Sequence, residues 1–442
     1  MHASGGWVTA TAVAAWLCLL TAHAPSAQAQ CAYGWTATGY PNGLNGNVWA
    51  LAVYDDGTGP ALFAGGDFTW AGSDPANHIA KWNGTSWSAL GSGVDGPVNA
   101  LVVFDDGTGP ALIVGGGFTT AGGAEAKYIA KWNGSGWSSL GSGASNGMND
   151  WVNALAVYKG ELIAGGDFTR AGGADADYIA AWNGSRWSSL GGVVSNGTDD
   201  SVYALIVNDS PYGSTLIAGG AFSKAGGFDA NHIAFWNGTL WSALISDAAN
   251  GVNGDVEALA FWNGCLVVGG TFTTAGSVNV GNIAAWNGSA WSTLQGPAGN
   301  GVTGAVWALT SFRNELIAAG SFLKAGGINV NRIAKWNGST WAALGTGLTQ
   351  PAYALTTYDS ELIVGGAFTT LGGAASRYWA RWRAQGPFVG PDFNHDCDVD
   401  AADLTSFERC ATGPALPYPA NLPPGCTLTA DPAGYIPADF DK

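Results

Sequence analysis

The sequence is poor in charge, and above all in positive charge. Only 11% of its 442 residues are charged, and 16 Lys and Arg stand against 32 Asp and Glu, so the formal net charge is −16. This balance disfavours nucleic acid and anionic membrane surfaces as partners, because both bind basic surfaces. Met occurs only twice, and strong helix formers are scarce in general, which argues against a helical protein.

Long apolar runs are missing beyond the N-terminus. No later segment has about 18 uninterrupted apolar residues, so we expect no further membrane-spanning helix. The apolar run from Trp7 to Ala22 is followed by Ala27-Gln28-Ala29, a small-x-small pattern typical of signal peptidase sites. We therefore expect residues 1–29 to be a signal peptide and the mature protein to be secreted, extracellular or at the cell surface.

Cysteine is rare as well. Six occur, and Cys18 falls within the expected signal peptide, which leaves an odd number. In an exported protein we expect Cys410 and Cys426 to form a disulfide that closes a Pro-rich loop. The spacing leaves the pairing of the other cysteines open.

Glycine and tryptophan are abundant, with 69 Gly and 22 Trp, and most of them belong to a unit that recurs seven times. Each copy has a Val-x-Ala-Leu motif or a variant of it, an apolar run ending in a Gly pair, and a Phe two residues later. A Trp follows 16 residues after the second Gly in every copy. The seven are Trp82, Trp132, Trp182, Trp236, Trp286, Trp336 and Trp382.

Each copy predicts four strands, which in the third copy cover residues 152–158, 161–166, 178–182 and 186–190. Asn183-Gly184 lies between the last two strands and predicts a two-residue type I′ hairpin turn, and Asn-Gly recurs in five other copies. A Ser or Thr follows each Asn-Gly and completes a glycosylation sequon, but the requirements of a turn explain the pattern without sugar.

The seventh copy ends after Trp382 without a fourth strand, and residues 33–38 near the N-terminus match the missing piece. Sheets of this size bury both faces by packing radially against their neighbours. We therefore expect an all-β fold, a seven-bladed β-propeller of four-stranded antiparallel blades. It would cover residues 30–387, be closed by the N-terminal strand, and be monomeric.

The Gly doublet that ends the second strand, with an aromatic residue in the third and a Trp in the fourth, resembles the kelch-type propeller repeat. The phrase Gly-Gly-x-Phe-Thr-x-Ala-Gly-Gly followed by Ile-Ala-x-Trp-Asn-Gly is also similar to repeats of bacterial exported proteins and of fungal cortical cell-polarity marker proteins. The resemblance covers about residues 31–387. It implies an architecture rather than a chemistry, because propellers host enzymes, lectins and scaffolds alike.

Residues 388–442 differ in composition and are rich in Pro and Asp. Oxygen-bearing side chains occupy positions 1, 3, 5, 7, 9 and 12 of a possible calcium loop, namely Asp392, Asn394, Asp396, Asp398, Asp400 and Asp403. Ca²⁺ takes six to eight such ligands, so we expect it as a cofactor, in a small tail with a short helix after the loop. The alternative is a solvated acidic linker, since Cys397 stands at position 6, where Gly is usual.

An Asp at position 12 makes this loop resemble that of dockerin modules. The resemblance implies attachment to a cohesin-like or cell-surface protein. Dockerins carry two loops, and Asp439-Phe440-Asp441 starts a second loop that the sequence does not complete, so we expect either a truncated module or a degenerate single-loop version.

The sequence offers no convincing catalytic constellation. Outside the expected signal peptide and calcium loop, the only histidines are His78 and His232, which occupy the same position in two distant copies and cannot share a metal ion. We therefore expect a non-catalytic protein.

The second residue of the first strand varies among the copies while its neighbours stay constant. In a propeller these residues would encircle the mouth of the channel, where aromatic and amide side chains could bind a protein or carbohydrate. They are Trp49, Asn99, Asn153, Tyr203, Glu257, Trp307 and Tyr353. The simpler alternative is that they only line the channel.

A second hypothesis is a carbohydrate-active enzyme, a glycoside hydrolase or lyase, with its active site at the propeller mouth. Glu257 would be one carboxylate of the pair that such mechanisms need. Loop residues that could supply the other are Asp150, Asp199, Asp200 and Asp255.

Overall fold

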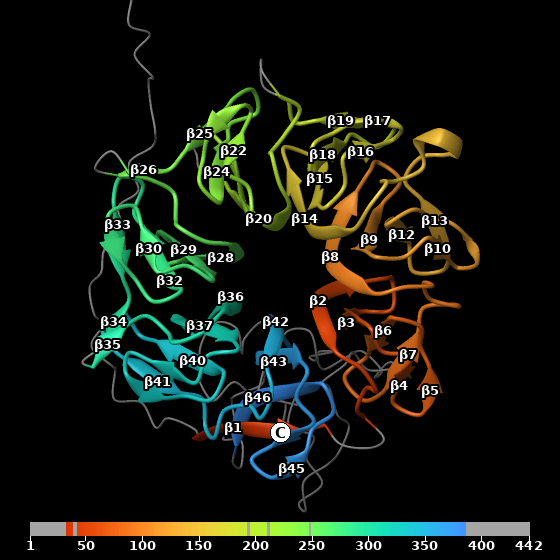
Figure 1. The fold of residues 1–442 in the computed structure, drawn as a ribbon. Helices are drawn as coiled ribbons and strands as arrows, with labels where there is room; N and C mark the ends of the chain where they lie inside the picture. The colour runs from red at the N-terminus through yellow and green to blue at the C-terminus, as the bar shows by residue number, and fades with distance from the viewer. Residues whose placement is uncertain are drawn as a thin grey trace, which may run out of the picture.

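The structure is a computed structural model that describes residues 32–38, 42–191, 195–209, 213–246, 249–296 and 298–385. Seven four-stranded antiparallel sheets stand around a central axis, so this part of the chain is a seven-bladed β-propeller, as predicted (Figure 1). Within these ranges there is no α-helix, and therefore no helix that could cross a bilayer. The expected signal peptide, calcium tail and Cys410–Cys426 disulfide lie outside the described residues.

The strands of each blade follow one another from the channel outward. Blade 1 has β2 (Val48–Asp55), β3 (Pro60–Gly66), β6 (Ile79–Trp82) and β7 (Trp87–Ala89). Blade 2 has β8 (Val98–Asp105), β9 (Pro110–Gly116), β12 (Ile129–Trp132) and β13 (Trp137–Ser139). Blade 3 has β14 (Val152–Tyr158), β15 (Glu161–Gly166), β18 (Ile179–Trp182) and β19 (Trp187–Ser189). Blade 4 has β20 (Val202–Asn208), β21 (Thr215–Gly220), β24 (Ile233–Trp236) and β25 (Trp241–Ala243).

The remaining blades repeat the pattern. Blade 5 has β28 (Val256–Trp262), β29 (Cys265–Gly270), β32 (Ile283–Trp286) and β33 (Trp291–Thr293). Blade 6 has β36 (Val306–Phe312), β37 (Glu315–Gly320), β40 (Ile333–Trp336) and β41 (Trp341–Ala343). Blade 7 has β42 (Ala352–Tyr358), β43 (Glu361–Gly366) and β46 (Trp379–Gln385), completed by β1 (Ala32–Ala37).

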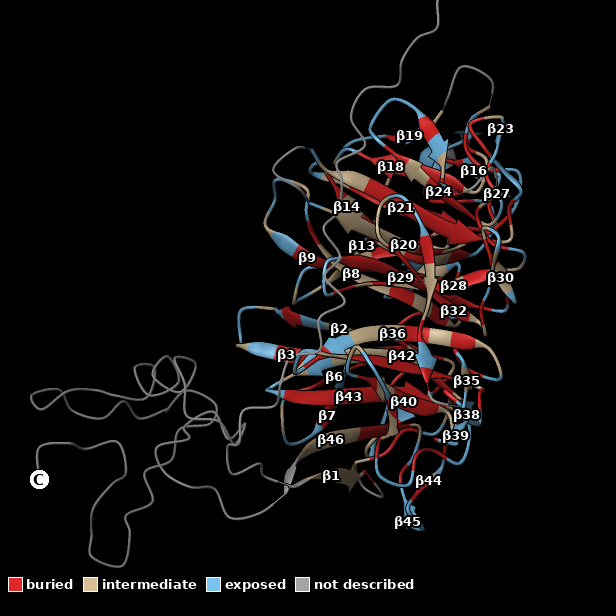
Figure 2. Cartoon of the chain, turned by 90° about the vertical axis from the view of Figure 1, so that its left-hand side faces the viewer, coloured by how far each residue is buried: buried red, intermediate tan, exposed pale blue. Residues whose placement is uncertain are grey.

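The second strands are almost entirely buried because each blade is covered on both faces by its neighbours (Figure 2). The first strands contact one another around the channel, and β42 contacts β2 to complete the circle. The continuously apolar second strands of the sequence therefore correspond to the middle of each sheet.

The N-terminal strand closes the ring. β1 pairs antiparallel with β46, which places Trp35 opposite Trp382 with their ring centroids 4.9 Å apart. The Trp35 indole N–H donates to the Leu344 carbonyl of blade 6 at 2.9 Å. The same bond joins other neighbouring blades, as from Trp137 to Leu90 at 2.8 Å, so the strand from the far end of the chain is a full member of its blade.

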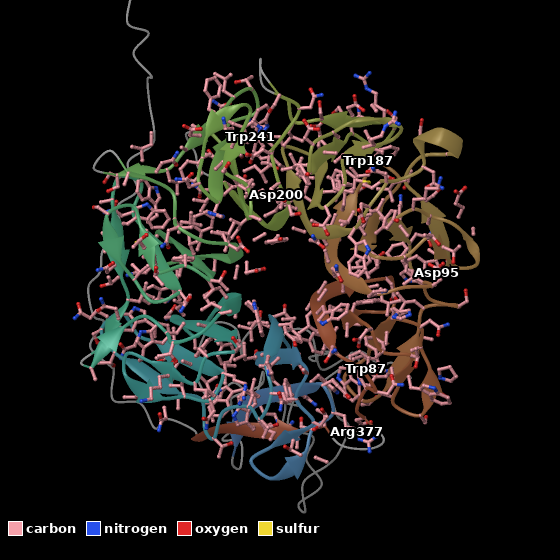
Figure 3. The ribbon with its side chains drawn as sticks, in the orientation of Figure 1. Trp87, Asp95, Trp187, Asp200, Trp241 and Arg377 are labelled. Carbon is pink, nitrogen blue, oxygen red and sulfur yellow. The ribbon has the colours of Figure 1, made fainter. Side chains whose placement is uncertain are left out.

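The seam between blades 7 and 1 has further bonds. The Leu44 N–H donates to the Arg377 carbonyl at 3.2 Å, and the Trp87 indole donates to the Asn42 carbonyl at 3.1 Å. Figure 3 shows Arg377 and Trp87 on either side of this seam. Blades 7 and 1 are therefore joined by hydrogen bonds, as other neighbouring blades are.

The Asn-Gly loops differ from the expected two-residue type I′ turns. In blade 3 the cross-strand pair Trp182–Trp187 leaves a four-residue loop, in which Gly184 has a positive φ of 92° and Asn183 does not. The Asn183 Oδ1 accepts from the Ser185 N–H and hydroxyl and from the Arg186 N–H, at 2.9–3.0 Å. The prediction of the turn type was wrong because the loop has four residues, closed by the Asn183 side-chain oxygen together with a bond from the Asn183 N–H to the Arg186 carbonyl at 3.3 Å.

The sequence analysis also missed a short hairpin in each blade, between the second and third long strands. The pairs are β4 (Trp70–Ala71) with β5 (Asp74–Pro75), β10 (Thr120–Ala121) with β11 (Ala124–Glu125), β16 (Arg170–Ala171) with β17 (Ala174–Asp175), β22 (Lys224–Ala225) with β23 (Phe228–Asp229), β30 (Thr274–Ala275) with β31 (Val278–Asn279), β38 (Lys324–Ala325) with β39 (Ile328–Asn329), and β44 (Thr370–Leu371) with β45 (Ala374–Ala375). Two more hairpins, β26 (Ile245–Ser246) with β27 (Ala249–Asn250) and β34 (Gln295–Gly296) with β35 (Gly299–Asn300), follow blades 4 and 5.

These hairpins hold the two-residue turns that were expected elsewhere. In blade 2 Ala121 pairs with Ala124, and the intervening Gly122 and Gly123 have φ values of 62° and 82°. Positive φ at both central residues defines a type I′ turn, which Gly adopts without strain.

The Gly pair sets the distance between neighbouring blades. A Cβ on Gly165 would lie 2.6 Å from Cγ1 of Val202 in the next blade, and a Cβ on Gly365 would lie 2.4 Å from Cγ1 of Val48. Blade 6 has Ala319 in place of this Gly, and it faces blade 7, whose first strand begins with Ala352 instead of Val. Both alanines are fully buried in one cluster, so the larger residue in one blade is compensated by a smaller one in the next.

We predict that Ala352→Val lowers the free energy of unfolding by about 1–3 kcal/mol, because the added Cγ1 would overlap the Ala319 side chain. The double variant Ala319→Gly/Ala352→Val recreates the pair found between the other blades and should recover most of the loss. Urea unfolding of the three proteins measures both effects. Equal stability of the single and double variants would contradict this explanation.

Candidate functional site

The variable residue of each first strand occupies a β-bulge. In blade 3 Val152 pairs with Gly166 and Ala154 with Gly165, so Asn153 is the extra residue, and the same register shift recurs in all seven blades. A Cβ on Gly166 would lie 2.0 Å from the Trp151 carbonyl oxygen, so only Gly allows the strand start to approach this closely. A bulge bends its strand and re-aims its side chain, which here turns the variable residue toward the axis.

Six of the seven predicted ring residues line one cavity of about 240 Å³ at the channel. They are Trp49, Asn99, Tyr203, Glu257, Trp307 and Tyr353. The seventh, Asn153, is instead held by hydrogen bonds: its Oδ1 accepts from Asn99 Nδ2 at 3.1 Å, and its Nδ2 donates to Asp167 Oδ1 at 3.0 Å. The structure therefore brings the predicted residues together at one site.

The ring is asymmetric. Trp307, Tyr353 and Trp49 come from the consecutive blades 6, 7 and 1, and we call them the aromatic arc. The Trp307 and Tyr353 ring centroids are 5.2 Å apart, with an interplanar angle of 39°. Blades 2 and 3 contribute the amides Asn99 and Asn153. The mouth thus offers apolar ring faces on one side and hydrogen-bonding groups on the other.

Glu257 is the single acid of the ring, between Tyr203 of blade 4 and Trp307 of blade 6. Burial, and to a smaller extent the nearby Asp255 carboxylate, together raise the pKa of its carboxyl group to about 7. Burial also raises the pKa of Tyr203, with Asp255 and Glu257 adding to the effect, and burial and Asp67 raise the pKa of Tyr353. The field at the mouth is therefore negative.

Three of the four loop acids considered as partners of Glu257 have structural roles. Asp199 accepts from the Ser223 and Lys224 N–H groups, at 2.8 and 2.7 Å. Asp150 and Asp200 accept from the N–H groups of Trp151 and Ser201. Figure 3 shows Asp200 nearer the axis than Trp241 of the same blade. Asp255 is the one of the four that acts electrostatically on Glu257.

The two histidines stand apart from each other, as expected. His78 and His232 directly precede the third strands, and both have a left-handed backbone with φ near 63–64°. His232 Nδ1 lies 3.6 Å from Asp255 Oδ1, and burial lowers the pKa of His78. No group of three or more His, Cys, Asp or Glu suited to a metal ion occurs among the described residues.

Sequence reasoning missed Asp67 and Asp167, which contribute to the mouth. Each lies between the Gly pair and the Phe of its copy, where most other copies have Gly, Ala, Ser or Thr. Asp67 Oδ2 accepts from Asn47 Nδ2 at 2.9 Å, and Asp167 holds Asn153. The variation at this position was the available signal.

Fold and site together define a β-propeller repeat protein with an asymmetric channel mouth. The family model of the Rax2 C-terminal beta propeller domain matches residues 35–199. No curated protein matches the sequence. A similar solved structure is the crystal structure of the computationally designed Ika8 protein, with 16% identity and a TM-score of 0.43, covering 78% of this chain and 99% of that chain.

We predict that Glu257→Gln stabilises the propeller above neutral pH. Because the folded pKa of about 7 exceeds the ordinary value of 4.5, ionisation of Glu257 costs the folded state stability as the pH rises between these values. The stability difference between variant and wild type should grow by about 3 kcal/mol from pH 4.5 to pH 8.

Chemical unfolding at a series of pH values measures this difference. Asp229→Asn, which removes the same charge from an exposed hairpin, is the control. A rise of equal size in the control, or none in Glu257→Gln, would contradict the assignment.

Proposed function

We propose that this protein is an exported, non-catalytic β-propeller that binds a protein or carbohydrate ligand at its channel mouth and is attached to a surface or complex through a calcium-dependent, dockerin-like tail. The observation that carries the proposal is the cavity at the mouth, lined by six variable residues on a constant framework. Variation at these positions, between neighbours that stay constant, indicates release from the packing rules that fix those neighbours.

The chemistry of the mouth suits recognition. The aromatic arc can stack on a sugar ring or an apolar side chain, and the Asn99 amide of blade 2 can hydrogen-bond to hydroxyl or peptide groups. The bulges hold the side chains on strands rather than on loops, so the surface is preformed and little ordering entropy is lost on binding.

Export is supported by the N-terminal pattern and by one cysteine. Cys265, the sole cysteine of the described part of the chain, is buried and disulfide-bonded. Disulfides persist in oxidising compartments and are rare in the cytosol, which favours a secreted or surface location.

We predict that Trp49→Ala/Trp307→Ala leaves the fold intact and abolishes binding, because it removes two of the three ring faces of the aromatic arc. Glycan and peptide arrays probed with wild type and variant measure this, with circular dichroism as the check of folding. Phe228→Ala removes an exposed aromatic ring outside the cavity and is the matched control. Binding that survives in the double variant would eliminate the mouth as the ligand site.

For the tail we predict that the full chain binds Ca²⁺ with a Kd of about 10⁻⁵ M or weaker. Asp392→Asn/Asp396→Asn should weaken binding at least about tenfold, since two oxygen ligands lose their charge. Asp431→Asn changes a tail carboxylate outside the loop and is the control. Equal loss in the control, measured by calorimetric titration, would mean that the tail acts only as a diffuse acidic segment.

The carbohydrate-active enzyme remains the second candidate, and one observation favours it. Glu257 has the raised pKa of a general acid and lies beside a second carboxylate, Asp255. The test is to incubate each oligosaccharide that binds on the array with the protein in solution and to separate any cleavage products of that oligosaccharide. Cleavage that is lost in Glu257→Gln would establish the enzyme and exclude the non-catalytic proposal.

A further inference from the structure

Glu257 and the aromatic arc line the same cavity, and together they have the composition of a cation-binding site. The geometry points to an arginine or lysine side chain of a protein partner as the group that enters the mouth. This inference rests on the proposed function and narrows it from a protein or carbohydrate to a protein with an exposed basic residue.

The first argument is that the Glu257 carboxylate has no counter-ion among the described residues. Among the described residues no group donates a hydrogen bond or forms an ion pair with the Glu257 carboxylate, whose environment consists of burial and the like charge of Asp255. Asp255 itself has His232 within 3.6 Å. A partly buried carboxylate without a partner is costly, and a cation in the cavity would supply the missing charge and donors.

The second argument is the position of the aromatic rings. Trp307 follows Glu257 around the ring, and Tyr353 packs against Trp307 with 5.2 Å between their ring centroids. Indole and phenol faces attract ammonium and guanidinium groups, and guanidinium also stacks flat on them. One cation can therefore contact a carboxylate and a ring face in the same cavity.

The third argument is the size of the cavity. Its volume of about 240 Å³ is below the range of 300–1,000 Å³ typical of sites for drug-sized ligands, so it suits one side chain rather than an oligosaccharide. The ring residues share its wall with the Ala and Leu of the first-strand motif, for example Leu259 and Leu309. The methylene stem of Arg or Lys can lie against these Leu side chains while the charged end reaches Glu257, whereas the ammonium of an amino sugar has no such stem.

Long-range electrostatics favour the same partner. The chain carries a formal charge of −16, and the Asp67 and Asp255 carboxylates add to the effect of burial in raising the pKa values of Tyr353 and Tyr203 at the mouth. A basic partner would be attracted to this face, and its association would slow as salt screens the field.

The test uses blocked glycine peptides that carry one central Arg or one central citrulline, which has nearly the same shape without the charge. Calorimetric titration of the full chain at pH 8 and low salt should show that the Arg peptide binds at least about tenfold more tightly. Glu257→Gln should remove this preference, and Asp229→Asn, which changes net charge equally, should keep it. Circular dichroism verifies that both variants are folded.

Equal binding of the two peptides, or an Arg preference that survives in Glu257→Gln, would overturn the inference. Chitosan oligomers form a further arm, and their binding without binding of the Arg peptide would also overturn it. If neutral glycans bind through Trp49 and Trp307 while the Arg peptide does not, the inference fails and the proposed function stands. If neither peptides nor glycans bind, both fail.

Discussion

One contact sets the spacing of neighbouring blades, and the propeller depends on it. It joins the first residue of the Gly pair that ends a second strand to the first residue of the next blade. Five junctions place a Val Cγ1 where the Cβ of another residue would stand, at 2.3–2.6 Å, and the junction of blades 7 and 1 repeats this geometry. The blades are therefore packed closely enough to bury the second strands almost entirely and to fix the position of every first strand around the axis. At the junction of blades 6 and 7, Ala319 replaces the Gly and Ala352 replaces the Val, so a larger side chain on one blade faces a smaller one on the next.

Much of the fold could be predicted from the sequence, because it is encoded in spacing that repeats. The invariant distance from the Gly pair to the Trp reports a sheet of constant width, and the missing fourth strand of blade 7 reports the N-terminal closure that the Trp35–Trp382 pair confirms. The turns were less predictable because Asn and Gly serve more than one geometry. Asn183 forms its turn through a side-chain oxygen, and the type I′ turn occurs at Gly122-Gly123, within strands of two residues that give no periodic signal.

The positions of the residues in the candidate site could be predicted from the sequence, but their interactions with one another could not. Variation at the second residue of the first strand identified the ring, and the bulges explain why that residue, rather than its neighbours, turns to the axis. The sequence could not show that Asn153 would bond to Asn99 and Asp167, since those contacts join different blades or different strands. The sequence also could not show that the pKa of the Glu257 carboxyl group is raised to about 7. The burial of this group depends on the closed ring of blades rather than on residues nearby in the chain. The residues shared by all blades form the scaffold, and the residues that differ among the blades form the candidate site.

The pairing of β1 with β46 joins residues more than three hundred positions apart, as does the bond from Trp35 to Leu344. During synthesis the first strand therefore emerges long before its partner, and its hydrogen-bonding edge is unsatisfied until blade 7 has followed. Such a nonlocal closure carries a large loop-closure entropy and belongs to the slow end of folding kinetics. Once formed, it pairs the edge of β46 that would otherwise be open, so the chain exchanges a late assembly step for resistance to unravelling from either end.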